Sequence, residues 1–97
     1  MAKVFLFHLY FPQLHAVDFS LSPNPASDQV EIISEKDAVD VIEIFHVDGA
    51  LNARWNYNDN NRRRKISIAD LSPGIYLLKV TSGKMAGEKL LVKMREE

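Results

Sequence analysis

The sequence contains no cysteine, so neither a disulfide framework nor thiol chemistry is available to it. Its 12 basic and 13 acidic residues nearly cancel, which argues against electrostatic binding of nucleic acid. No apolar run reaches the ~18–20 residues that a membrane-spanning helix needs. Catalytic and metal-binding signatures such as Gly-x-Ser-x-Gly and His-Glu-x-x-His are also missing. We therefore expect no enzyme, no cofactor, no metal site, no nucleic-acid partner and no transmembrane span.

What remains is a chain of 97 residues with 46 % hydrophobic residues, which is typical of one globular domain. Helical periodicity is nearly absent, whereas apolar and polar residues alternate with a period of two along most of the chain. Turn signals recur about every 8–12 residues, a pattern typical of an all-β, Ig-like antiparallel sandwich with Greek-key connections. We predict seven short strands, at residues 17–21, 29–32, 39–47, 50–55, 66–68, 75–80 and 90–94.

The connections between these strands carry turn residues. Pro23 ends the first strand, because proline cannot donate to a ladder. Asp48 and Gly49 predict a two-residue hairpin, in which glycine supplies the positive φ. Residues 56–61 read "NYNDNN" and predict an exposed loop, and residues 82–84 predict a turn followed by a second glycine at position 87.

One charge cluster stands out, the "RRRK" of residues 62–65. We interpret it as a solvated loop whose charges keep a neighbouring sheet edge from pairing. The alternatives are a grip on phosphates or on an acidic partner. Trp55 and Tyr57, together with Arg62, also allow a platform for stacking sugars or bases, which we regard as the weaker interpretation.

The "LSPGIY" of residues 71–76 is similar to the tyrosine corner of Greek-key sandwiches. We expect Tyr76 to be buried and its hydroxyl to bond to the backbone near Leu71 or Ser72. Pro73 presets φ for the turn, and Gly74 tolerates backbone angles that other residues avoid. The role of this motif is architectural.

The N-terminal residues 1–16 are interpreted apart from the sandwich of residues 17–97. Their apolar run, residues 4–11, fits an extra strand, a remnant of upstream sequence or a weak signal-like segment. An uncovered strand of this kind invites pairing at its edge. We therefore expect residues 4–11 to pack on their own sandwich or to pair with a second copy, giving a homodimer.

Three segments in order carry a family resemblance: "LSPNPASDQVEI" at 21–32, "VIEIFHVDGAL" at 41–51, and "ADLSPGIYLLKV" at 69–80 leading into "KLLVK" at 89–93. The sequence resembles the type A C-terminal sorting domain of the type IX (Por) secretion system. The resemblance implies a seven-stranded Ig-like sandwich that addresses a parent protein for export. The parent would cross the periplasm and the bacterial outer membrane and be secreted or held at the cell surface.

The resemblance also implies partners, namely the secretion machinery and a sortase-like peptidase of the outer membrane, with the domain as their substrate. The residues that match the family's motifs are Pro23, Asn24, Pro25, Gly49, Leu71, Gly74, Tyr76, Lys89, Leu90, Val92 and Lys93. One departure is the tail that follows the last lysine, residues 94–97, whose acidic end offers one way to mask the signal.

Two questions stay open at this point. The "SPNPASD" segment, residues 22–28, is either a stiff corner or a surface that a partner reads. In the last strand, alternation places Lys89, Leu91 and Lys93 on one face, which we expect to suit an acidic docking groove. The alternative function is a stand-alone Ig-like or fibronectin-like adhesion module that binds carbohydrate or protein.

Overall fold

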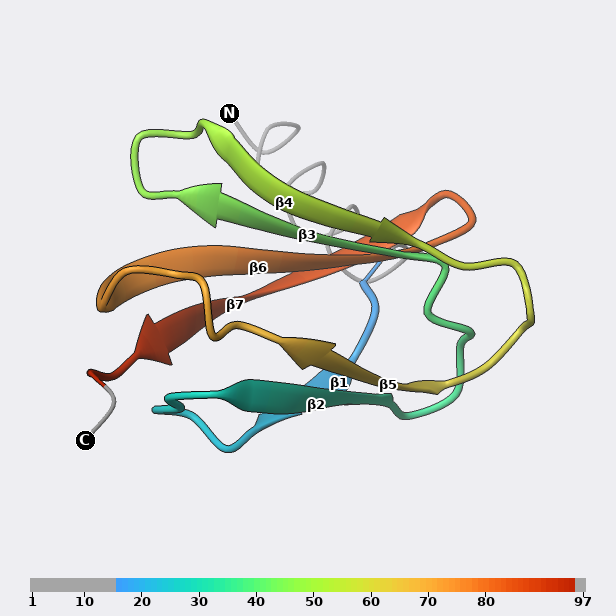
Figure 1. Ribbon diagram of the computed structural model, residues 1–97. Helices are drawn as coiled ribbons and strands as arrows, with labels where there is room; N and C mark the ends of the chain where they lie inside the picture. The colour runs from blue at the N-terminus through green and yellow to red at the C-terminus, as the bar shows by residue number, and fades with distance from the viewer. Residues whose placement is uncertain (1–15, 96–97) are drawn as a thin grey trace, which may run out of the picture.

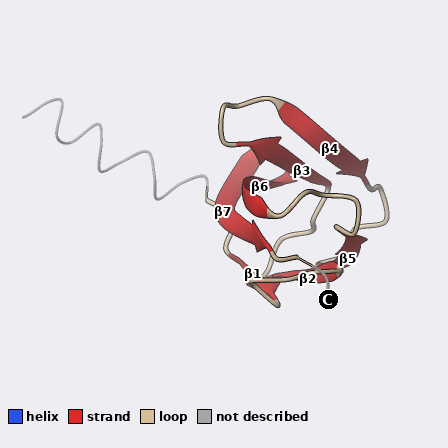
Figure 2. Cartoon of the chain, turned by 60° about the vertical axis from the view of Figure 1, so that its left-hand side comes forward, coloured by secondary structure: helices blue, strands red, loops and turns tan. Residues whose placement is uncertain are grey.

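The computed structural model describes residues 16–95, which form two stacked antiparallel sheets without any helix (Figures 1 and 2). The three-stranded sheet has the order β1-β2-β5 and consists of β1 (Phe19–Ser22), β2 (Gln29–Ser34) and β5 (Arg63–Ser67). The four-stranded sheet has the order β4-β3-β6-β7 and consists of β3 (Val41–His46), β4 (Leu51–Asn56), β6 (Gly74–Ser82) and β7 (Met85–Lys93). The predicted all-β sandwich of about seven strands is confirmed.

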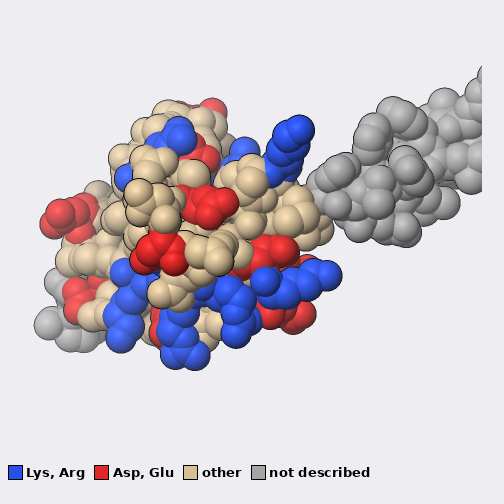
Figure 3. Space-filling view, turned by 90° about the vertical axis from the view of Figure 1, so that its right-hand side faces the viewer, with Lys and Arg blue, Asp and Glu red and all other residues tan. Residues whose placement is uncertain are grey.

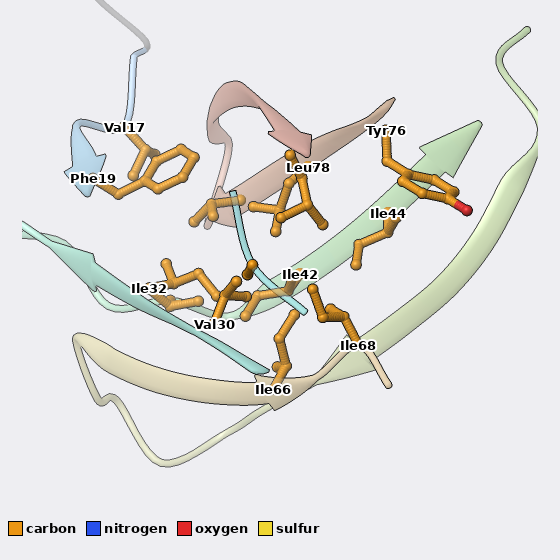
Figure 4. Close-up of a cluster of buried hydrophobic side chains, with 14 residues drawn as sticks. Val17, Phe19, Val30, Ile32, Ile42, Ile44, Ile66, Ile68, Tyr76 and Leu78 are labelled. Carbon is orange, nitrogen blue, oxygen red and sulfur yellow. The ribbon is translucent and has the colours of Figure 1, made fainter. Parts of the chain in front are cut away.

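The core lies between the two sheets, where alternate residues of the strands meet (Figure 4). The period of two follows from strand geometry, because successive side chains point to opposite faces. Burial of each large aliphatic side chain contributes roughly 1.5–3 kcal/mol. The fully buried apolar side chains include Val30, Ile32, Val39, Ile42, Ile44, Ile68, Leu78, Val80 and Leu91.

The hairpin between β3 and β4 differs from the predicted two-residue turn. His46 N–H donates to Ala50 O and Gly49 N–H donates to His46 O, which encloses a three-residue loop. Gly49 has a φ of +96°, whereas Asp48 has a negative φ. A primed two-residue turn at these positions would need a positive φ at Asp48 as well, so the hairpin does not contain one. A type I turn followed by a left-handed glycine explains this geometry. The position of the hairpin and the need for glycine were predicted correctly, but the turn type was wrong.

Strand β7 begins at Met85, five residues before the predicted start. Gly87 lies within the strand and not in a turn. A Cβ atom at this position would sit 2.1 Å from the carbonyl oxygen of Val17, so the glycine permits a close backbone approach. The approaching segment pairs with β7 in parallel at Ala16 and Ala86, and Val17 N–H donates to Ala86 O.

The predicted solvated loop at residues 62–65 is also wrong, since residues 63–65 belong to β5. This strand pairs with β2, where Arg64 lies opposite Ile32. Alternation along the strand turns Arg64 into the sandwich, where it is buried, and leaves Arg63 and Lys65 exposed. A run of cations was read as a loop because composition does not show which faces of a strand are covered.

The expectation that residues 4–11 pack on the sandwich or pair with a second copy lies outside the described residues. Between Ala16 and Arg95 no helix is long and apolar enough to span a membrane.

Candidate recognition site

The segments that carry the family resemblance meet at one end of the sandwich (Figure 1). The antiparallel register places the start of β6 beside the end of β7, with Gly74 opposite Lys93. It also places His46, at the end of β3, opposite Tyr76. The segment 22–28 reaches the same place through its contacts with β7. We call this end of the sandwich the recognition end. It consists of residues 22–28, the β3–β4 hairpin, residues 68–76 and the end of β7.

Asn24 bonds to the outer edge of β7 through its side chain. Its Nδ2 donates to Leu90 O at 2.8 Å, and its Oδ1 accepts from Val92 N–H at 2.9 Å. A primary amide offers one acceptor and two donors. Asn24 therefore pairs with β7 as a peptide group of a neighbouring strand would do.

Ala26 continues this pairing with its own backbone. Its N–H donates to Val92 O at 2.9 Å, and its carbonyl accepts from Met94 N–H at 2.7 Å, in a parallel bridge centred on Lys93. The side chain is 1 % exposed and belongs to the core. Residues 24–26 satisfy the edge of β7, and we call residues 24–27 the strap. The 22–28 segment is thus a corner that also closes a sheet edge.

Lys93 is buried under the strap, with only 4 % of its surface exposed. Its Nζ donates to Ile68 O at 2.9 Å, to Ala69 O at 3.4 Å and to Ser27 O. An ammonium group has three donors, and these three carbonyls can accept all of them. The hydrogen bonds offset the cost of removing the charge from water. Lys93 thereby ties the strap to the segment that leads into β6.

This burial corrects the expectation that the two lysines face an acidic docking groove. The alternation in β7 is as predicted, because Lys89, Leu91 and Lys93 share one face. That face points into the sandwich, where Leu91 and Lys93 are buried. Lys89 is exposed near the edge, with its Nζ 5.6 Å from the ring centroid of Phe19. Alternation defines two faces, but only the position of the second sheet decides which one is inside.

The tyrosine corner is confirmed. Tyr76 is 6 % exposed, and its hydroxyl donates to Ser72 O at 2.6 Å. Its ring lies 5.7 Å from that of His46, at the end of β3. Leu71 packs against the core, and its N–H donates to Ile68 O, the carbonyl that also accepts from Lys93. The corner and the lysine therefore fix the same stretch of backbone.

The remaining matched residues lie on the surface of the recognition end. Pro23, Pro25, Gly49 and Gly74 are exposed. Leu90 is 58 % exposed and Val92 is partly exposed on the outer face of β7. Of the matched residues, Tyr76 and Lys93 are therefore buried structural residues, while these six present surface to solvent.

Residues 16–95 contain no group of three His, Cys, Asp or Glu side chains that is placed to hold a metal ion. His46 contacts Asn52 at 3.1 Å through Nε2. The arrangement offers a shaped surface and a hydrogen-bonded strand edge, which suits recognition by another protein.

Sequence reasoning missed the second buried cation, at the opposite end of the sandwich. Arg64 donates from Nε and Nη2 to Val39 O, at 3.2 and 2.9 Å, and from Nη2 to Asp59 Oδ1 at 2.5 Å. Its guanidinium lies 3.8 Å from the centroid of the Tyr57 ring. The hydrogen bond from Arg64 lowers the pKa of Asp59, and burial raises the pKa of Tyr57. The alternative platform of Trp55, Tyr57 and Arg62 is not formed, because Tyr57 stacks on Arg64 and Arg62 donates to the carbonyls of Ser34 and Glu35.

Figure 3 shows this opposite end, where Lys and Arg side chains gather along the lower side with Asp and Glu among them. Arg63, for example, pairs with Glu31 at 3.2 Å. Because the charges are interspersed, this end does not present a purely basic surface for phosphates. The only sequence signal for a buried Arg64 was its place two residues before Ile66, on the apolar face of β5.

The comparison with protein families finds a match to the secretion system C-terminal sorting domain over residues 20–93. Neither the comparison with curated proteins nor that with solved structures finds a match. The matched range begins at the second residue of β1 and ends at Lys93, so it includes the rest of β1, the strands β2 to β7 and the whole strap. The chain belongs to the family of C-terminal sorting domains of the type IX (Por) secretion system.

Proposed function

We propose that the recognition end presents the strap and the outer side of β7 together as the signal that the type IX secretion machinery reads. Membership in the family means that the domain is a C-terminal sorting signal and that its parent protein is exported. One observation supports the finer proposal. The strap closes the edge of β7 through Asn24 and Ala26. Pro23 and Pro25, on either side of Asn24, are exposed, and so is Leu90, whose carbonyl accepts from Asn24.

In this proposal the buried residues of the motif act indirectly. Lys93 and Tyr76 hold residues 68–72 and the strap in place, so that the exposed residues keep one arrangement. A preformed surface binds a partner at a lower entropic cost than a flexible one. The domain catalyses nothing, and a sortase-like peptidase acts on the parent protein after export.

The test is the export of a reporter that carries a signal peptide in front and the whole chain behind, in a bacterium with a type IX system. We expect the reporter at the cell surface or in the medium, and in the periplasm of a strain that lacks the secretion pore. Leu90→Lys should reduce export, because it places a charge on the outer side of β7. Leu51→Lys is the matched control, since Leu51 is similarly exposed, at 51 %, but lies on β4 at the far edge of the same sheet.

A second pair of variants tests the strap. Asn24→Ala removes both side-chain bonds to β7 and should reduce export, whereas Asn58→Ala, in the exposed loop before β5, should not. Circular dichroism of each purified variant separates loss of recognition from loss of folding. Retention of the unmodified fusion in the periplasm, also after residues 95–97 are removed, would contradict the sorting function and favour an adhesion module. Equal export of the Leu90 and Leu51 variants would contradict only the assignment of the surface.

A further inference from the structure

The outer face of the four-stranded sheet carries apolar side chains that the described residues leave exposed. Leu51, Ile75 and Leu90 are each more than half exposed, at 51, 54 and 58 %. A shallow hollow on this face is lined in part by Phe45, Leu77 and Leu90. Contiguous apolar surface of this kind marks an interaction site more often than an ordinary surface does.

The strand register arranges four apolar side chains of this face in a row, one from each strand. Leu51 of β4 lies opposite Phe45 of β3, Phe45 opposite Leu77 of β6, and Leu77 opposite Leu90 of β7. Neighbouring strands are about 4.8 Å apart, so this apolar row is about 14 Å long.

A second row on the same face consists only of charged residues. It lies two residues away along β3, β6 and β7, and three residues away along β4, where the pairing of β3 with β4 shifts register between Ile44 and Phe45. Arg54 of β4 lies opposite Glu43 of β3, Glu43 opposite Lys79 of β6, and Lys79 opposite Glu88 of β7. The order across the sheet is therefore positive, negative, positive, negative. Arg54 and Glu43 form an ion pair at 3.2 Å, whereas Lys79 has no ion-pair partner within 4.0 Å among residues 16–95.

This charge order is complementary to itself when it is reversed. A two-fold axis that runs along the strands, between β3 and β6, lays β3 over β6 and β4 over β7 of a second copy. Each positive residue of the charged row then faces a negative one, with Lys79 over Glu43 of the second copy at the centre. The apolar row meets the apolar row of the second copy, as in the packing of two sheets face to face.

Other ways to pair the two faces lose this match. A two-fold axis across the strands places the charged row either over apolar residues or over like charges of the second copy. Desolvation of unpaired charges and like-charge contacts both disfavour association. The observed register thus selects one symmetric arrangement, and symmetric pairing of one surface with itself is the usual form of a dimer.

We infer that the outer face of the β4-β3-β6-β7 sheet binds a second copy of this chain, with the apolar and charged rows each facing their counterparts. The face measures about 19 Å by 25 Å, or roughly 500 Å², against about 800 Å² per partner in a standard interface. The dimer is therefore weak, with a dissociation constant of micromolar order or above. It covers Leu90 and Val92, so it competes with any partner that reads the outer side of β7.

The first measurement is sedimentation equilibrium of the full chain from about 10 µM to about 1 mM, a range that brackets such constants. We expect a reversible monomer–dimer equilibrium. Lys79→Glu should weaken it at least about tenfold, because the new carboxylate faces Glu43 of the second copy. Lys84→Glu makes the same charge change in the exposed turn between β6 and β7, away from the face, and should leave the equilibrium unchanged.

Mixing two variants gives the decisive result. Glu43→Lys alone should weaken the dimer as Lys79→Glu does, since both create like charges at the centre of the interface. A mixture of the two variants restores opposite charges at all four positions of the row. We therefore expect the mixture to form a heterodimer at concentrations where neither variant associates alone.

Three outcomes overturn the inference. The first is a full chain that stays monomeric over the whole range. The second is an association that Lys79→Glu leaves unchanged, which points to another surface such as residues 4–11. The third is a mixture that associates no more than its components do, although circular dichroism shows both variants folded. None of these results bears on export, so the inference and the sorting function fail separately.

Discussion

Two cations are buried among residues 16–95, one at each end of the sandwich, and their surroundings differ. Lys93 donates to three main-chain carbonyls from two segments. Arg64 donates to one carbonyl and to the carboxylate of Asp59, and it stacks on Tyr57. Carbonyls do not titrate and cannot move independently of the backbone. Lys93 therefore fixes the backbone of the recognition end, whereas Arg64 holds an exposed loop through a group that responds to pH.

Replacement of Lys93 should have the largest effect. Lys93→Met keeps most of the stem but removes the ammonium donor from three carbonyls, of which only Ile68 O keeps another donor, the Leu71 N–H. We expect this to lower the free energy of unfolding by roughly 2–4 kcal/mol. Urea denaturation measures the change. Lys89→Met is the control, since Lys89 is exposed, and should change it by less than about 0.5 kcal/mol. Equal stability of the two variants would mean that the buried lysine contributes nothing beyond packing.

Replacement of Arg64 should cost less. Arg64→Met leaves only the Val39 carbonyl unpaired in a buried place, because Asp59 is exposed and water can hydrate it. We expect a loss of roughly 1–2 kcal/mol. Arg63→Met, one residue away on the exposed face of β5, loses only a surface ion pair and should cost at most about 0.5 kcal/mol. A larger loss for Arg64 than for Lys93 would reverse the comparison between the two ends.

The tyrosine corner sharpens the description of the Lys93 end. Tyr76→Phe removes the donor to Ser72 O and should cost roughly 1–2 kcal/mol by the same denaturation measurement. Tyr76 and Lys93 hold the same stretch, residues 68–72. The double variant should therefore lose an amount of unfolding free energy that differs from the sum of the two single losses. Strict additivity would show that the two side chains act independently.

The smallest effect is a difference in acid sensitivity. The pKa of Asp59 in the folded chain lies below its usual value near 3.8, because Arg64 donates to the carboxylate. The unfolded state therefore takes up its proton first as the pH falls, and the stabilisation is lost progressively below about pH 4. Asp59→Asn should make the urea midpoint fall less steeply between about pH 5 and pH 2. An unchanged slope would remove Asp59 from the acid response of this end.

Individual residues show which contacts could be predicted from the sequence and which could not. Tyr76 and its bond to Ser72 were predicted from a local motif, because the donor and acceptor are four residues apart. The partners of Asn24 and Lys93 were not predicted. The sequence placed Asn24 only within the segment 22–28, yet its side chain bonds to groups 66 and 68 residues away. No local pattern encodes such a contact.

The sequence by itself determined the sandwich class, the number of strands, the tyrosine corner and the family. Strand alternation, turn residues and spaced motifs are properties of neighbouring residues, and they depend on backbone geometry that is the same in every chain. Only the tertiary structure decided that Lys93 and Arg64 point inward, that the strap closes the edge of β7, and that the charged row crosses four strands in alternating order. These features depend on which sheet covers which face and on the register between distant strands, both of which are fixed by packing of the whole chain.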